Sequence, residues 1–117
     1  MPATVVGTPI SDALAAEAEA VTALLRSDAP RAEKVEAADA LIIEFVRVGI
    51  DYHFHGPARR FGLHGLLVRV IDVAAATTLK ALKTATRRVL KGLSDEQLTG
   101  IADEIEERLY PVEVVEE

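Results

Sequence analysis

The chain has 117 residues and a net charge of −6; half of its residues are hydrophobic, five are aromatic and none is cysteine. The lack of cysteine excludes disulfides and thiolate metal sites, and no uncharged apolar run is long enough to cross a membrane, so we expect no membrane partner and a cytoplasmic location. Alanine, valine and leucine dominate the apolar content, which predicts a single all-α domain: a compact bundle of about four helices in residues 11–110, with extended arms over residues 1–10 and 111–117.

The charge is divided into three blocks along the sequence. Residues 1–55 hold nine acids and four bases, residues 56–92 one acid and eight bases, and residues 93–117 nine acids and one base, which gives −5, +7 and −8. A basic segment between two acidic ones either binds a polyanion or is neutralised within the fold or by a neighbouring subunit. We favour neutralisation, with the acidic last helix as the nearest source of partners for Arg87, Arg88 and Lys91.

Two amphipathic helices are expected in the first half of the chain. Ser11 is a suitable N-cap for the first, over about residues 12–27. Asp28 can cap the second, which we expect to end near Ile50 with Pro30 in its first turn. The apolar stripe of the first helix is Leu14, Ala18, Val21 and Leu25, and that of the second is Val35, Ala38, Ile42, Phe45 and Gly49.

Residues 51–62 are expected to form the main loop, because Gly56, Pro57 and Gly62 interrupt any helical pattern. Four of the five aromatic side chains lie in or beside this segment, interleaved with two arginines. Rings and guanidinium planes of this kind stack on unpaired bases or anchor a protein interface. We favour a small core that pins the loop onto the helices. The residues concerned are Phe45, Tyr52, Phe54, Arg59, Arg60 and Phe61.

The three histidines, His53, His55 and His64, lie within twelve residues of one another. Together with Asp51, the first two form a candidate site for zinc, nickel or iron. Ligands two positions apart point the same way only on an extended strand, and no second cluster supplies further ligands. We therefore favour histidines that hydrogen-bond or pack at a helix junction, and expect neither a metal nor another cofactor.

A long helix is expected from about residue 63 to residue 91, ending at Gly92 in the left-handed C′ conformation. The first half of this segment is apolar nearly all round and β-branched, a pattern that a buried strand also fits. One face is apolar and the opposite face is basic. The apolar stripe is Leu67, Ile71, Ala74, Thr78, Leu82, Ala85 and Val89; the basic stripe is Arg69, Lys80, Lys83, Arg87 and Lys91.

The last helix has the clearest local signal in the chain. Ser94 and Gln97 stand at the spacing of a capping box, in which each side chain bonds the other residue's backbone N–H. Pro111 is expected to end the helix. The side chains expected to be buried are Leu98, Ile101, Ala102, Ile105 and Leu109.

No nucleophile elbow, dinucleotide-binding glycine pattern or P-loop occurs in the sequence, so we expect no enzyme and no catalytic residues. The apolar surface exceeds what a single four-helix unit buries, which predicts a non-enzymatic structural or assembly protein that forms homo-oligomers or binds other protein subunits. By analogy with small helical subunits whose extended arms contact neighbouring copies, we expect the protein to be a component of a virion, such as that of a phage, or of another protein shell. The interface candidates are Tyr52, Phe54, Arg59, Arg60, Phe61, Val5, Val6, Ile10, Val112 and Val114.

Two alternative functions remain open from the sequence. One is a nucleic-acid-associated regulator that uses the basic block of residues 56–92 together with the aromatic loop. The net charge and the lack of a helix-turn-helix pattern make nucleic acid the less favoured partner. The other is a small metal-dependent enzyme centred on the three histidines.

Overall fold

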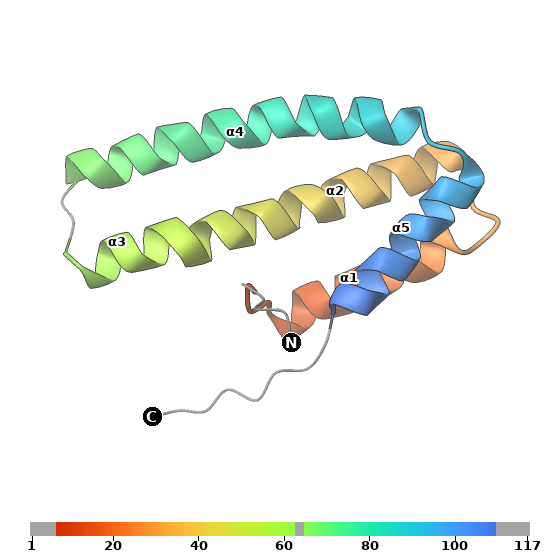
Figure 1. Ribbon diagram of the computed structural model, residues 1–117, viewed down its shortest axis with the longest axis horizontal. Helices are drawn as coiled ribbons and strands as arrows, with labels where there is room; N and C mark the ends of the chain where they lie inside the picture. Colours follow the sequence, from red (N-terminus) through yellow and green to blue (C-terminus); the bar gives the residue numbers. More distant parts are fainter. Residues whose placement is uncertain (1–6, 63–64, 110–117) are drawn as a thin grey trace, which may run out of the picture.

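The computed structural model describes residues 7–62 and 65–109, and every regular element in that part of the chain is helical (Figure 1). The joined elements α2, η1 and α3 form one continuous helix of 30 residues, so the expectation of an all-α chain with four helices is confirmed. Val5, Val6, Val112, Val114 and His64 lie outside the described residues. The elements are α1 (Asp12–Leu25), α2 (Arg31–Ile50), the π-helical turn η1 (Asp51–His55), α3 (Gly56–Arg60), α4 (Gly65–Lys91) and α5 (Asp95–Arg108).

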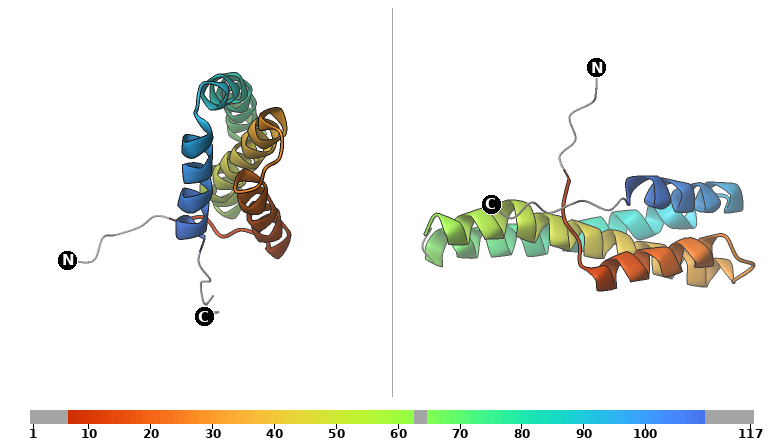
Figure 2. Two further views of the ribbon diagram at one scale, coloured as in Figure 1. Left: turned by 90° about the vertical axis from the view of Figure 1, so that its right-hand side faces the viewer. Right: turned by 90° about the horizontal axis from the view of Figure 1, so that it is seen from below.

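The joined helix and α4 run antiparallel as a long hairpin (Figure 1). At 1.5 Å per residue, α4 is about 40 Å long, whereas α1 and α5, with 14 residues each, are about 21 Å long. The two short helices lie along only one half of the hairpin (Figures 1 and 2). We call this half, with α1 and α5, the proximal bundle. The other half, residues 50–62 and 65–76, is the distal hairpin.

The hydrophobic core lies in the proximal bundle. Each of its helices places an apolar stripe inward, and the stripes expected for the first, second and last helices are confirmed as buried or part-buried. Complete burial of one leucine contributes on the order of 2 kcal/mol. The buried cluster consists of Leu14, Ala18, Val21, Leu25, Val35, Ala38, Leu41, Leu90, Leu98 and Ala102.

The N-terminal caps follow the sequence at two helices and depart from it at the third. Ser11 accepts a hydrogen bond from the Leu14 backbone, and both hydrogen bonds of the Ser94–Gln97 capping box are present. The prediction that Asp28 caps the second helix is wrong, because Pro30 occupies the N-cap position and no side chain caps the helix. Ser27 instead accepts from the Ala29 backbone, and the resulting turn moves the helix start beyond Asp28.

The predicted loop at residues 51–62 is wrong, because the second helix continues to Arg60. The π-helical turn makes this possible: the Gly56 N–H reaches back five residues to the Asp51 carbonyl. A proline inside a regular helix leaves a carbonyl unbonded and presses its ring against the preceding turn. The wider turn adds one residue just before Pro57, which then occupies the first turn of α3, where a proline is tolerated.

The long helix is confirmed over Gly65–Lys91, so the buried-strand alternative is wrong for these residues. Its predicted end at Lys91 is also confirmed. The left-handed conformation expected of Gly92 is wrong, since within the described chain only Gly62 has a positive φ, at 66°. The Gly92 and Leu93 N–H groups bond the carbonyls three residues before them, and this tightened turn ends the helix without a left-handed residue.

Candidate interaction surface on the distal hairpin

The distal hairpin has almost no buried core of its own. Between Leu41 and Leu90, Ala58 is the only buried residue in the described part of the chain. Among residues 7–62 and 65–109, eight large hydrophobic side chains are exposed, and seven of them belong to the distal hairpin. The seven are Tyr52, Phe54, Phe61, Leu66, Leu67, Val70 and Val73.

These seven side chains expose a large area. Phe61 and Leu66 are 79% and 80% exposed, and the other five are 49–62% exposed. At 100° per residue, Leu66, Val70 and Val73 lie on the side of α4 opposite Val68, which faces α2, so they point away from the other helix of the hairpin. The seven side chains therefore belong to more than one side of the distal hairpin, and exposed apolar groups gathered in this way are typical of an interaction site.

The apolar side of α4 is wider than the side that faces α2. The covered side chains are Val68, Ile71, Ala75, Leu79, Leu82, Thr86 and Leu90, each buried or part-buried. Only Ile71 and Leu82 belong to the stripe expected from the sequence; the other five members of that stripe are exposed, so this part of the prediction is wrong. The error has a physical cause: α2 covers one edge of a broad apolar side, and the remainder faces outward.

The aromatic side chains do not form the small core that we favoured. Phe45 packs against the proximal core, but Tyr52, Phe54 and Phe61 are exposed. Residues 51–60 are helical, so Tyr52 and Phe54 project from a helix and Phe61 directly follows its last residue. The loop that such a small core would fix in place does not exist. The ring of Tyr52 stands edge-on to His53, with centroids 5.0 Å apart.

The two described histidines make different contacts: His55 joins the two helices of the hairpin, and His53 joins the N-terminal segment to the hairpin. His55 Nε2 lies 2.6 Å from Asp72 Oδ1 on α4, and His55 Nδ1 lies 3.5 Å from Asp51 Oδ1. His53 turns away from this cluster and pairs with the Thr8 hydroxyl at 3.0 Å. The metal candidates His53 and Asp51 are thus divided between two contacts, and no group of three or more metal-ligand residues gathers among residues 7–62 and 65–109.

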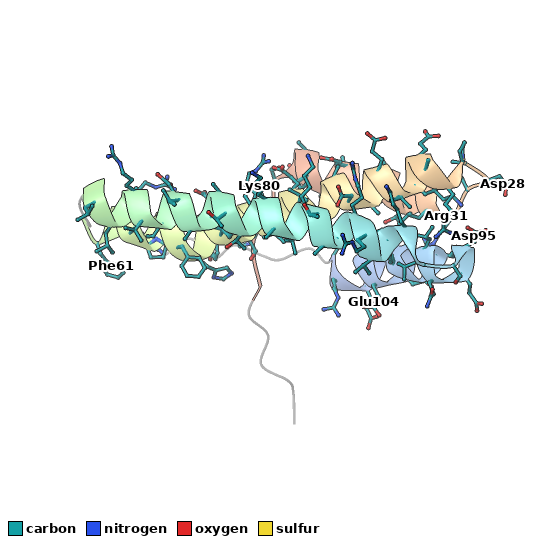
Figure 3. The ribbon with its side chains drawn as sticks, turned by 90° about the horizontal axis from the view of Figure 1, so that it is seen from above. Asp28, Arg31, Phe61, Lys80, Asp95 and Glu104 are labelled. Atoms are coloured by element: carbon teal, nitrogen blue, oxygen red, sulfur yellow. The ribbon has the colours of Figure 1, made fainter. Side chains whose placement is uncertain are left out.

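Acids of α5 pair with Arg26 and Arg31. The prediction that they pair with basic residues of α4 is wrong for the described residues. Arg26 contacts Asp103 at 2.7 Å and Glu106 at 2.5 Å. The hydrogen bond to Asp103 makes the larger contribution, and the hydrogen bond to Glu106 the next, to raising the pKa of the Arg26 guanidinium above its ordinary value. Arg31 contacts Asp95 at 3.2 Å and also donates to the Lys91 and Leu93 carbonyls. Figure 3 shows Arg31 and Asp95 together at the proximal end.

The basic side of α4 therefore faces solvent. Among the described residues, its one ion pair joins Arg87 to the buried Asp39 at 3.7 Å. The surface is hollowed beside this pair, where Glu36 and Lys91 also line the depression between α2 and α4. Two carboxylates, the exposed Glu36 and the buried Asp39, thus lie beside the last basic residues of α4, which weakens the attraction for a polyanion.

Other interface candidates occupy different positions. Arg59 and Arg60 stand exposed at the tip of the hairpin, where Arg59 lies 3.5 Å from Asp51. Ile10 packs against the chain's own core. Leu66 and Val70 were absent from the candidates drawn from the sequence, although the apolar character of the first half of the long helix pointed to them.

Within the described residues, no helix combines the length and the apolarity that crossing a membrane requires. No protein-family model, curated protein or solved structure matches the chain. The chain therefore takes no function from a relative, and its own exposed surface is the basis for assigning one.

Proposed function

We propose that this chain is a non-enzymatic structural protein that assembles with copies of itself through the distal hairpin. One observation carries the proposal: seven large apolar side chains are exposed on the same half of the hairpin. Transfer of this surface from water into a packed contact is favourable. Assembly is thus the role that this surface supports best.

The proximal bundle supports the proposal because the helices of the hairpin form a buried core there. There, side chains of α1 and α5 complete a buried cluster with those of the same two helices, and Leu41 and Leu90 in that cluster are 0% and 2% exposed. A hairpin of this composition is therefore able to form a buried core when another pair of helices lies against it. In the distal half, that second pair has to come from outside the described chain.

Two valines on α4 provide a matched experiment. Val70 in the distal hairpin is 59% exposed and Val89 in the proximal bundle is 63% exposed. Sedimentation velocity and light scattering would compare wild type, Val70→Glu and Val89→Glu across a range of concentrations. We expect wild type and Val89→Glu to form the same multimer. Val70→Glu should raise the dissociation constant at least about tenfold, because a charge enters a desolvated contact.

Circular dichroism of each variant would confirm that the helices are retained. The proposal is wrong if wild type sediments as a 12.6 kDa monomer at every concentration. It is equally wrong if the two glutamate variants assemble as well as wild type.

A further inference from the structure

The tip of the distal hairpin carries large apolar side chains. Phe61 directly follows the last residue of α3 and is 79% exposed, while Leu66 and Leu67, the second and third residues of α4, are 80% and 53% exposed. At 1.5 Å per residue, both leucines lie within about 3 Å of the start of α4 along its axis. The three side chains therefore belong to the same end of the molecule, away from α1 and α5 (Figure 1).

These three side chains do not share one side of the hairpin. Leu66 and Leu67 are neighbours in a helix and so point about 100° apart around α4, and Phe61 follows the other helix. A partner that lies along the hairpin covers one side of it. A lipid surface that the tip enters end-on surrounds it and covers every side.

The tip is also positively charged. Residues 52–71 contain no acid and three arginines, Arg59, Arg60 and Arg69. All three are exposed, and the one ion pair that the described chain gives them joins Arg59 to Asp51 at 3.5 Å. Each arginine lies within about one helical turn of an apolar side chain of the tip. Arginines so placed extend their long stems along apolar groups and keep the guanidinium at the level of the lipid phosphates.

The first acid along α4 lies well back from the tip. Asp72 is about 10 Å along the helix axis from Gly65, and it pairs with His55 across the hairpin at 2.6 Å. Amphipathic helices at a membrane surface bury their apolar groups about 5–10 Å into the boundary between headgroups and acyl chains. The acid-free end of α4 therefore has the depth that such a contact uses.

We propose that the tip of the distal hairpin inserts end-on into the surface of a membrane that contains anionic lipids. Its apolar side chains enter the boundary between headgroups and acyl chains, and its three arginines bind lipid phosphates. The expectation of no membrane partner rests on the lack of a spanning segment, and an interfacial contact needs none. Insertion does not depend on the proposed self-assembly: Tyr52 and Val73 lie more than about 10 Å back from the tip and remain available to another copy.

Vesicle flotation tests the apolar part of the contact. We expect wild type to float with vesicles made of equal parts of phosphatidylcholine and phosphatidylglycerol, and to bind phosphatidylcholine alone at least about tenfold more weakly. Leu66→Glu should lower the affinity for the anionic vesicles at least about tenfold, because it places a charge among the acyl chains. Val89→Glu is the matched control: Val89 is 63% exposed on the same helix but in the proximal half, so this variant should bind like wild type.

The same assay tests the arginines. The double variant Arg59→Gln/Arg60→Gln should bind the anionic vesicles at least about tenfold more weakly at low salt, and the difference should shrink at high salt. Arg88→Gln, at an exposed position in the proximal half of α4, should bind like wild type.

A single tryptophan reports insertion directly, since the chain has none. Emission from Phe61→Trp should move to shorter wavelength when the anionic vesicles are added, and lipids brominated on their acyl chains should quench it. Val89→Trp should show neither effect. Circular dichroism would confirm that all variants keep their helices.

The inference fails if wild type stays in solution with the anionic vesicles, or if Leu66→Glu floats as well as Val89→Glu. It fails equally if the arginine variant alone loses binding, because the chain then adsorbs to negative charge without inserting. Sedimentation without lipid separates this result from the proposed function. A monomer that floats with vesicles supports insertion and contradicts self-assembly, whereas a multimer that stays in solution assigns the tip to contacts between copies and contradicts insertion.

Discussion

The proximal bundle and the distal hairpin share two helices and differ in what covers them. Helix α4 runs through both, yet Leu90 is 2% exposed at one end and Leu66 is 80% exposed at the other. Leu90 lies on the side of α4 that faces α2, and it belongs to the buried cluster that side chains of α1 and α5 complete. Leu66 lies about 120° away from it around the helix. Burial along α4 is therefore decided by the side of the helix as well as by the helices that lie nearby: Val89, in the proximal half but outside the covered side, is 63% exposed.

The largest difference in stability between the two halves is expected when one leucine in each is replaced by alanine. Leu41 is fully buried in the proximal bundle, whereas Leu67 is 53% exposed in the distal hairpin. Leu41→Ala leaves a cavity and should lower the free energy of unfolding by about 2–5 kcal/mol. Leu67→Ala should cost less than about 1 kcal/mol when both are measured by denaturant unfolding in the monomeric Val70→Glu background. Similar losses at the two positions would show that the distal half is as well packed as the proximal one.

A smaller effect separates two glycines of the distal hairpin. Gly62 has a φ of 66°, a backbone conformation that an alanine adopts only with strain, so Gly62→Ala should destabilise by about 1–2 kcal/mol. Gly56 is helical with φ of −59°, and an added Cβ would meet the Asp51 carbonyl at an ordinary 3.5 Å. Gly56→Ala should therefore stabilise by about 0.5–1 kcal/mol. Thermal melts that shift in the same direction for both variants would contradict the π-helical path through Gly56.

The smallest of the three effects concerns the cap of α5. Ser94→Ala removes the acceptor of the Gln97 N–H and should lower stability by about 1 kcal/mol. Because the loss is local to the proximal bundle, self-assembly through the distal hairpin should be unchanged. Thr99→Ala, at an exposed position inside the same helix, is the control and should not lower stability, because alanine has the higher helix propensity. A Ser94→Ala variant that melts like wild type would show that the capping box adds nothing.

The sequence predicts those features that depend on neighbouring residues. The capping box at Ser94, the N-cap at Ser11 and the stripes of α1, α2 and α5 all arise within a few residues, and each is confirmed. The break expected at Gly56 and Pro57 was wrong because a π-helical turn accommodates the proline, and nothing in the local pattern distinguishes that turn from a loop.

The exposed surface was only partly predictable. Tyr52, Phe54 and Phe61 were candidates from the sequence because aromatic rings gather there, whereas Leu66 and Val70 look the same as core residues of a buried helix. Their exposure depends on which side of α4 packs against α2, which is a tertiary relation. The charge partners were misassigned for the same reason: Arg26 and Arg31 reach the acids of α5 across space, while Arg88 is nearer in sequence.

The π-helical turn at Asp51–His55 has a consequence for how the sequences of the two halves of the molecule can change independently. It sits at their junction and contains one residue more than regular helix geometry requires. Deleting that residue would rotate everything beyond it by about 100° about the rod axis, carrying Ala58 and His55 away from α4, while α1 and α5 kept their contacts. An insertion or deletion at this point would therefore turn the exposed apolar side chains of residues 56–62 to a new direction and leave the packing of the proximal bundle unchanged.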